Sequence, residues 1–352
     1  MEKLLKIGIT HGDINGVSYE IILKILSDSR ILDCCIPIVY GSPKVFAFYK
    51  KTFDFGNINY SIVRSAQEAS AKRIYIVNCC SDDIKVEVGK QTPEAGVFAL
   101  DALEAATTEL RAGKIDAMVT APINKSAIQS DKFKFPGHTE YLEKFAGNQS
   151  IMMLISGSVR VALATNHVPV QKISEAITKE LIVKKLQLLN QSLVRDFSIT
   201  CPRIAVLGLN PHSSDNGLLG SEEQNIIKPA IDTANSQGIT CMGPLSADGF
   251  WGSGAFASYD AILAMYHDQG LAPFKALFQD LGVNFTGGLP FVRTSPAHGT
   301  AYNLAGKNCA NPSSFLQALY MAIDVVKNRA RYKEISENPL KVEVEVIAEK
   351  IG

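Results

Sequence analysis

Short apolar runs alternate with longer amphipathic segments along most of the chain. The apolar runs carry few polar residues on either face, which is typical of strands buried on both sides in a parallel sheet. They predict strands at 4–10, 36–41, 73–78, 114–122, 150–157, 159–165, 203–209 and 261–266.

The segments between these runs have helical patterns. One helix is predicted to begin at Thr92-Pro93, with Glu94 in its first turn, and to end at Gly113. Further helices are predicted at 18–28, from Ser42, at 173–197, at 221–238 and at 313–332. Strands that alternate with helices imply an α/β fold, with helices on both faces of a mostly parallel sheet.

Three of the six histidines follow the ends of predicted strands: His167, His212 and His267. In an open α/β sheet, ligands bind beyond the carboxyl ends of the strands, so folding is expected to bring these imidazoles together. Three neutral imidazoles with an open fourth position suit a catalytic divalent metal. The alternative is three unrelated loop histidines that hydrogen-bond to the backbone.

Composition narrows the class of protein. A length of 352 residues favours two domains, and Lys+Arg equals Asp+Glu at 35 each, so no nucleic-acid or membrane surface is expected. Seven cysteines without a C-x-x-C motif, and no signal-peptide pattern, predict free thiols in a reducing cytoplasm.

Two stretches suggest anion binding. His138 and Thr139 stand at the start of an expected helix, where free amides, an imidazole and a hydroxyl can bind an anion; alternatively, Thr139 only caps the helix. Lys275, Asn284 and Arg293 could clamp a phosphate, and Arg293 is the one charged residue between Val283 and Ala305, a segment expected to be rich in turns.

The first turn, HGDING at 11–16, lacks the G-x-G-x-x-G spacing of a dinucleotide loop and is interpreted as a tight turn. His11 in this turn is expected to be a turn residue, with a metal ligand as the alternative.

A series of motifs in order along the chain resembles the 4-hydroxythreonine-4-phosphate dehydrogenase family of pyridoxal-phosphate biosynthesis. The resemblance covers about positions 7 to 325, and its motifs are APINK, FPGHTEYL, RVALATNHVPV, LGLNPHSSDNGLLGSEE, GPLSAD, AMYHDQGLAPFK and GLPFVRTSPAHGTA. The resemblance implies a fold similar to isocitrate and isopropylmalate dehydrogenases, with two α/β/α domains and an active-site cleft between them. The domains are expected at 1–123 plus 270–352, on the dinucleotide side, and at 124–269, which would bind the metal and form the dimer.

The resemblance also implies roles for individual residues. The metal ligands fall on the same three histidines, His167, His212 and His267. Substrate-binding positions match His138, Thr139, Lys275, Asn284 and Arg293. NAD or NADP would contact His298, Gly299, Thr300 and Asn311, in a segment similar to the adenosine-binding loop of those dehydrogenases. Lys275, Asp248 or His138 would act in catalysis, and Lys275 and Asp248 stay open as the base.

The implied reaction is NAD-dependent oxidation of 4-phosphohydroxy-L-threonine, followed by loss of carbon dioxide to give 3-amino-2-oxopropyl phosphate. Zinc is the expected metal because imidazole ligands favour it, with magnesium or cobalt as alternatives. The family is dimeric with ligands from both subunits, so a homodimer with a shared site is expected.

The chain departs from the family pattern at 11–18 and 249–258. A paralogous dehydrogenase acting on phosphorylated threonate or erythronate is therefore the alternative function. A zinc hydrolase and a metal-binding regulatory protein without turnover are more remote readings.

Overall fold

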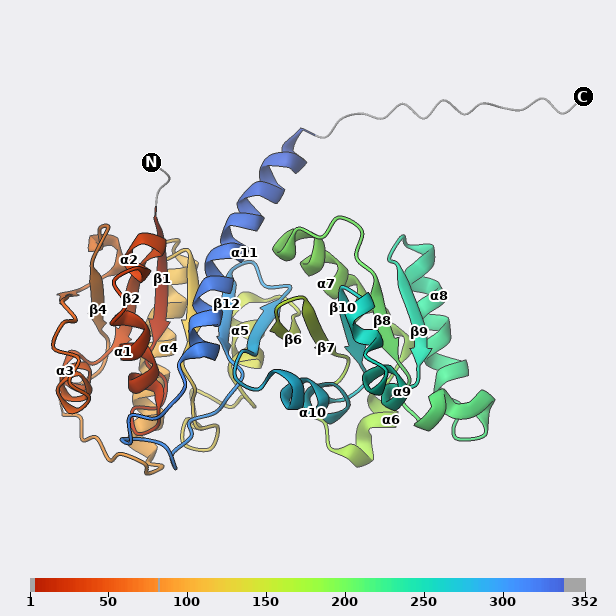
Figure 1. The fold of residues 1–352 in the computed structure, drawn as a ribbon, viewed down its shortest axis with the longest axis horizontal. Coiled ribbons are helices and arrows are strands. Elements are labelled where there is room, and N and C mark those ends of the chain that lie inside the picture. The colour runs from red at the N-terminus through yellow and green to blue at the C-terminus, as the bar shows by residue number, and fades with distance from the viewer. Residues whose placement is uncertain (1–3, 82, 339–352) are drawn as a thin grey trace, which may run out of the picture.

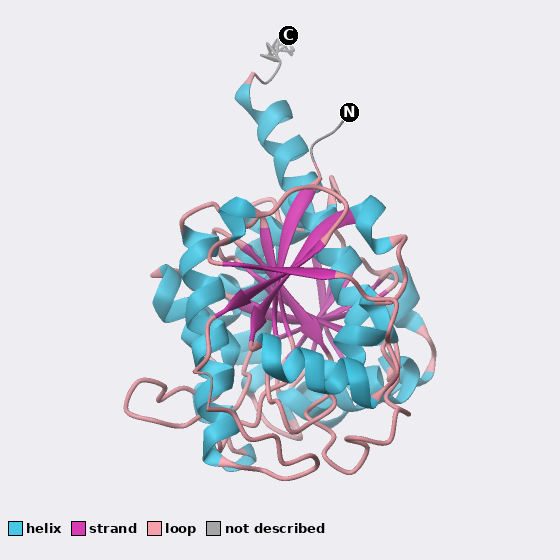
Figure 2. Ribbon diagram, turned by 90° about the vertical axis from the view of Figure 1, so that its left-hand side faces the viewer, coloured by secondary structure: helices cyan, strands magenta, loops and turns pink. Residues whose placement is uncertain are grey.

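One twisted sheet runs through the described part of the chain (Figure 1, Figure 2). This computed structural model describes residues 4–81 and 83–338. Within them the spatial order of the strands is β3 (Tyr60–Val63), β4 (Ile74–Asn78), β2 (Cys35–Gly41), β1 (Leu5–Thr10), β5 (Ala117–Thr120), β12 (Val292–Pro296), β11 (Val283–Gly287), β6 (Ile151–Ser156), β7 (Val159–Leu163), β10 (Ala261–Ala264), β8 (Ile204–Leu207) and β9 (Cys241–Leu245).

The sheet is mostly parallel, as the alternating pattern predicts. Strand β11 is antiparallel to both of its neighbours, β12 and β6, and β6 is antiparallel to β7. The remaining paired strands are parallel. The β11–β12 hairpin turns at Gly288, where φ is 84° and a Cβ atom would lie 2.8 Å from the Gln149 carbonyl oxygen. Glycine is therefore required at this turn.

Helices cover both faces of the sheet (Figure 2). They are α1 (Ser18–Leu26), α2 (Ile31–Cys34), α3 (Pro43–Thr52), α4 (Pro93–Arg111), α5 (His138–Ala146), α6 (Ile173–Ala176), α7 (Lys179–Phe197), α8 (Lys228–Ser236), α9 (Ala247–Gly252), α10 (His267–Phe278) and α11 (Ser313–Glu337). Because both faces are covered, every residue of β2, β5, β6 and β10 is buried.

Local sequence explains where the long helices begin. The Thr92 side chain accepts a hydrogen bond from the Ala95 amide at 3.2 Å and Pro93 is the first helical residue, so α4 starts as predicted. Thr178 accepts from the Leu181 amide at 3.1 Å. This cap divides the helix predicted at 173–197 into α6 and α7. The helix predicted at 221–238 begins with a π-helical turn, Glu223–Ile227, before α8.

Helix α11 lies in the middle of the molecule, where it packs against β12 and α7 (Figure 1). Fully buried Asp196 of α7 accepts a 2.7 Å hydrogen bond from Nε of Arg329, on α11, and a 2.8 Å bond from Nε of Arg195. Burial alone would raise the pKa of Asp196, but the two arginines outweigh burial and lower it. This ion pair fixes α11 against the half of the sheet that contains β6 and β7.

The sequence pattern misses strands β3, β9, β11 and β12. The segment 283–305 was expected to be rich in turns. It contains the two strands β11 and β12, so that expectation is wrong for them. These central strands contain Asn284, Thr286, Arg293, Thr294 and Ser295, so they lack the apolar run by which the other buried strands were identified.

The division into domains at 1–123 plus 270–352 and at 124–269 stays a prediction, and its last residues, 339–352, lie outside the described part of the chain. In that described part, no helix is both long enough and apolar enough to cross a bilayer.

Candidate active site

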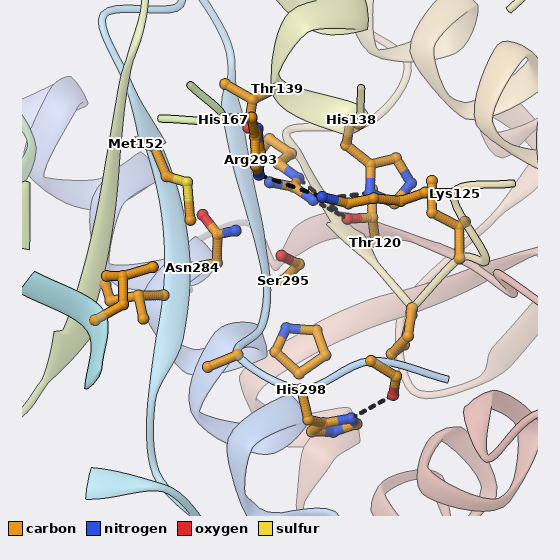
Figure 3. Close-up of a pocket in the computed structure, with 18 of the residues that line it drawn as sticks. Thr120, Lys125, His138, Thr139, Met152, His167, Asn284, Arg293, Ser295 and His298 are labelled. Carbon is orange, nitrogen blue, oxygen red and sulfur yellow. Dashed lines mark hydrogen bonds between the residues drawn. The ribbon is translucent and has the colours of Figure 1, made fainter. Parts of the chain in front are cut away.

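A pocket of about 260 Å³ lies where the two halves of the sheet meet (Figure 3). Its wall on one side comes from the ends of β5 and β12, with Thr120, Ser295 and Pro296. On the other side are Met152 and Leu154 of β6. Strand β11 runs in the opposite direction, so Asn284 near its beginning pairs with Ser295 near the end of β12. The change of strand direction in mid-sheet therefore creates the pocket floor.

Arg293 of β12 forms that floor (Figure 3). Its side chain is only 2% exposed, and the guanidinium donates to the Thr120 hydroxyl at 2.7 and 3.0 Å and to the Thr286 hydroxyl at 3.2 Å. Within residues 4–81 and 83–338, no carboxylate accepts a hydrogen bond from it. Burial lowers the pKa of Arg293 to about 9, opposed by nearby Glu140. A buried cation with neutral partners is a strong indication of a site for an anion.

His138, the first residue of α5, completes this cation site. Arg293 Nη2 lies 3.1 Å from His138 Nδ1. A guanidinium can only donate, so Nδ1 accepts and the ring proton stands on Nε2. Burial, then Arg293 and Lys125, lower the pKa of His138 well below 6.5, so the imidazole is neutral. Its Nε2 atom is buried and has no hydrogen-bond partner among the described residues, so it is a donor available to a ligand.

Thr139 lies one residue further along α5, and the suggestion that it only caps the helix is wrong. The N-cap is Gly137, which has no side chain. Thr139 is 6% exposed and lines the pocket. The first residues of α5 thus line the same cavity as Arg293, and an anion site at this helix start stays a prediction.

Helix α10 brings two more predicted residues to the pocket. His267, Leu271 and Lys275 are spaced by four residues, so they share one face of the helix, and all three line the cavity. Asn284 Oδ1 is also buried, and no group in the described part of the chain forms a hydrogen bond with it. The pocket therefore contains all five predicted substrate-binding residues: His138, Thr139, Lys275, Asn284 and Arg293.

The three predicted metal ligands are only partly brought together. The strands β7, β10 and β8 are parallel neighbours, so their carboxyl ends lie on one edge of the sheet. The His167 and His267 rings lie 5.9 Å apart between centroids, and both line the pocket. His212 does not line it, and among the described residues no group of three His, Cys, Asp or Glu side chains is close enough to hold a metal.

His212 begins an unusual left-handed turn. Five successive non-glycine residues from His212 to Asn216 have φ between 44° and 67°. Such a run is rare and carries strain, which is often stored at functional sites. Asp248 lies near His212 and outside the pocket lining; a hydrogen bond from Ser246 is the main cause of its lowered pKa.

The residues that were predicted to bind the dinucleotide lie in two places, some in the pocket lining and some outside it. His298 and Gly299 line the pocket, and within residues 4–81 and 83–338 the buried His298 Nε2 has no hydrogen-bond partner. Thr300 and Asn311 do not line it: the Thr300 carbonyl accepts from the Val17 amide at 3.0 Å, and Asn311 Oδ1 accepts from the Ser313 amide at 2.9 Å.

The first turn is buried and supports this segment. A Cβ atom at Gly16 would lie 2.6 Å from the Thr300 carbonyl oxygen, so glycine permits their contact. His11 is fully buried between the Tyr19 hydroxyl and the Phe98 carbonyl, each at 2.9 Å. The interpretation of His11 as a turn residue is confirmed.

Two polar residues of the pocket, Lys125 and Glu140, were not singled out from the sequence. Lys125 Nζ lies 3.2 Å from His167 Nε2, and Glu140 Oε1 lies 3.2 Å from His167 Nδ1. Burial raises the pKa of Glu140, but the hydrogen bonds from His167 and from its own backbone amide, together with the charges of His167 and Lys125, lower the pKa overall. Each stands in a quoted motif, APINK or GHTEY, but only the fold shows what its side chain contacts.

Comparison with known proteins shows what this chain is similar to. Residues 33–322 match the sequence profile of the family described as pyridoxal phosphate biosynthetic protein PdxA. The 4-hydroxythreonine-4-phosphate dehydrogenase of Bacteroides thetaiotaomicron is 57% identical over 97% of this chain and 94% of its own length. A protein of Oceanobacillus iheyensis, provisionally named D-threonate 4-phosphate dehydrogenase, is 37% identical over 94% of this chain and 100% of its own length.

Comparison with solved structures finds a protein of the same name. The crystal structure of 4-hydroxythreonine-4-phosphate dehydrogenase from Klebsiella pneumoniae superposes with a TM-score of 0.80. The two chains are 30% identical, and the match covers 92% of this chain and 98% of the other.

Proposed function

The chain belongs to the family of the pyridoxal phosphate biosynthetic protein PdxA, and we propose on that premise that it is a 4-hydroxythreonine-4-phosphate dehydrogenase. The proposed reaction is oxidation of 4-phosphohydroxy-L-threonine by NAD to 2-amino-3-oxo-4-phosphooxybutanoate. This β-keto acid then loses carbon dioxide to give 3-amino-2-oxopropyl phosphate.

The observation that carries the proposal is the buried, unpaired cation of Arg293. A phosphate or carboxylate would accept charge-assisted hydrogen bonds from Arg293 and a further bond from His138 Nε2. Lys275 and Lys125 add positive charge to the same pocket, whereas Glu140 is its one carboxylate among the described residues. Such a balance suits a small substrate with two anionic groups.

The substrate would lie across the pocket. Asn284 Oδ1, which has no partner, would accept a hydrogen bond from a hydroxyl or ammonium group. Lys275 is the better candidate of the two proposed bases, because it lines the pocket and Asp248 does not. In this role it takes the proton of the C3 hydroxyl once its own amine is neutral.

For each of the two groups that the family implies, the pocket contains part of the expected set of residues. His298 Nδ1 donates to the Gly299 carbonyl at 2.9 Å, so its unpaired Nε2 would accept a hydrogen bond from a dinucleotide beside the substrate. His167 and His267 offer two imidazoles to a divalent cation, for which zinc is the first candidate and magnesium or cobalt the alternatives. The chemistry supplied by these groups when bound is hydride acceptance by NAD and Lewis-acid polarisation of the alcohol by the metal.

A third imidazole would have to come from elsewhere, since His212 does not reach the other two within one chain. We therefore propose a homodimer in which the partner subunit completes the metal site.

The proposed reaction is tested by its products. Purified protein, NAD, Zn²⁺ and 4-phosphohydroxy-L-threonine should give reduced nicotinamide and carbon dioxide in equal amounts, with 3-amino-2-oxopropyl phosphate identified by mass. Nicotinamide reduction without carbon dioxide release would contradict the decarboxylation step. Absence of turnover at any substrate concentration would contradict the function.

The relative from Oceanobacillus iheyensis favours a second candidate, oxidation of phosphorylated threonate. That substrate carries a hydroxyl where phosphohydroxythreonine carries an ammonium group, and both contain the phosphate and carboxylate that the pocket's cations suit.

A further inference from the structure

The two ring nitrogens of His167 face groups of opposite charge. Glu140 Oε1 lies 3.2 Å from Nδ1, and Lys125 Nζ lies 3.2 Å from Nε2. A carboxylate can only accept a hydrogen bond and an ammonium can only donate one. The proton of a neutral His167 ring is therefore on Nδ1, and the Nε2 lone pair faces Lys125 and the pocket.

The two partners are held in place by their own elements. Glu140 is in the first turn of α5, in the segment that carries His138 and Thr139. Lys125 stands in the loop after β5, where Asn124 Oδ1 accepts hydrogen bonds from the amides of Ser126 and Ala127, each at 3.0 Å. Each partner thus reaches His167 from a different, structured segment.

A metal ion and Lys125 would compete for the same lone pair. A divalent cation binds imidazole through an unprotonated nitrogen, which in His167 is Nε2. In the structure, that nitrogen accepts from the lysine ammonium. A carboxylate on the opposite ring nitrogen fixes the tautomer and increases the basicity of the ligand nitrogen.

We propose that Glu140 is a positioning residue that keeps His167 in the Nδ1–H tautomer, and that Lys125 occupies Nε2 until a divalent cation displaces it. This inference rests on the proposed metal site and assigns roles to two residues outside the histidine triad. Displacement leaves the Lys125 ammonium free inside a pocket whose other cations, Arg293 and Lys275, are proposed to bind substrate. Binding of the metal would then free the Lys125 ammonium to bind an anionic substrate, so the two binding events would be coupled.

Zinc affinity is the first test, measured on metal-free protein with Zn²⁺ alone against a chromogenic chelator, without substrate or turnover. Glu140→Leu should weaken Zn²⁺ binding by about ten- to a hundredfold, and Glu140→Gln, which keeps an acceptor oxygen, by less. Lys125→Met should strengthen Zn²⁺ binding by about two- to tenfold, because the competing hydrogen bond is gone. Matched controls are Glu94→Gln and Lys134→Met, which change exposed residues outside the pocket lining and should leave the affinity unchanged.

The tautomer is the second test, and it needs no metal. Nitrogen shifts of labelled histidines should show His167 as Nδ1–H in the metal-free protein, and Glu140→Leu should move it towards Nε2–H. An Nε2–H tautomer in the unmodified protein would overturn the inference, as would unchanged zinc affinity in Glu140→Leu. If the unmodified protein binds no Zn²⁺ at all, the metal site of the proposed function fails, and the tautomer still decides the role of Glu140.

Discussion

Arg293 is the single residue whose surroundings most clearly indicate a binding site for an anion. A fully buried guanidinium that hydrogen-bonds only neutral groups has lost its hydration without gaining a counter-ion. The protein tolerates this cost because Thr120, Thr286 and His138 satisfy the donors. What remains unsatisfied is the charge, which an anionic substrate can neutralise.

This leads to opposite effects of Arg293→Met on binding and on stability. Loss of the charge-assisted bonds should reduce kcat/KM for the phosphorylated substrate by about 1.5–3 kcal/mol, a factor of roughly 10 to 150. Removal of an uncompensated buried cation should leave the melting temperature unchanged or raise it. NAD binding should change little. Steady-state kinetics and calorimetry on the same preparation check both parts.

A conserved kcat/KM together with a large fall in melting temperature would assign Arg293 to structure instead. Arg111→Met is a suitable control, because Arg111 is an exposed arginine at the end of α4 outside the pocket lining.

At the scale of elements, the pocket depends on close contacts between backbones. Helix α4 packs against the loop that carries Lys125, and a Cβ atom at Gly96 would lie only 2.0 Å from the Ala127 carbonyl oxygen. The loop and the helix can meet because position 96 has no side chain. Helix α4 therefore helps to set the position of Lys125 in the pocket.

Gly96→Ala should reverse the usual effect of this substitution. Glycine to alanine in a helix ordinarily stabilises by about 0.5–1 kcal/mol. Here the clash with backbone should destabilise the protein by about 1–3 kcal/mol and displace Lys125. Chemical unfolding measures the first effect and KM for the substrate the second. Gly252→Ala in α9 is the matched control, because nothing lies within 4 Å of its Cβ position; equal effects of the two changes would contradict the account.

The elements also show how far the sequence predicts this fold. Apolar runs such as 159–165 and 203–209 identify strands, because a strand covered on both faces excludes polar residues. The same criterion misses β11 and β12, because these strands place Asn284 and Arg293 in the pocket and so contain polar residues. The prediction therefore fails at the functional site, where chemistry replaces the hydrophobic pattern.

The contacts between site residues were also predicted only in part from the sequence. The strand-end pattern correctly places His167 and His267 together, since β7 and β10 are parallel neighbours. It cannot show that His212 lies outside the pocket lining and begins a left-handed turn, because non-glycine residues ordinarily prefer negative φ. Nor does spacing along the chain show that Glu140 and Lys125 meet at His167.

At the scale of the whole molecule, the separation of His212 from His167 and His267 bears on assembly. If the metal site is shared, one of the three histidines comes from the partner subunit. Each single histidine-to-alanine variant should then lose metal and activity while keeping its fold, as circular dichroism would show. Full metal content in two of the three variants would contradict the triad.

Mixing the variants in pairs identifies the shared ligand. A pair whose two lost histidines come from different subunits forms one intact site per heterodimer, so some activity returns after subunit exchange. The pair whose histidines come from the same subunit recovers nothing. Two active mixtures and one inactive mixture are expected among the three. No recovery in any mixture, or sedimentation of the active protein as a monomer, would contradict a shared site.

A panel of substrates decides whether this pocket oxidises a phosphorylated amino acid with NAD. The rate of nicotinamide reduction is measured for 4-phosphohydroxy-L-threonine, 4-phosphothreonate and 4-phosphoerythronate, each with the unphosphorylated parent compound as control. We predict the highest kcat/KM for 4-phosphohydroxy-L-threonine and a large loss without phosphate, because Arg293 then stays unpaired. A higher kcat/KM for 4-phosphothreonate or 4-phosphoerythronate, or equal rates with and without phosphate, would contradict the account.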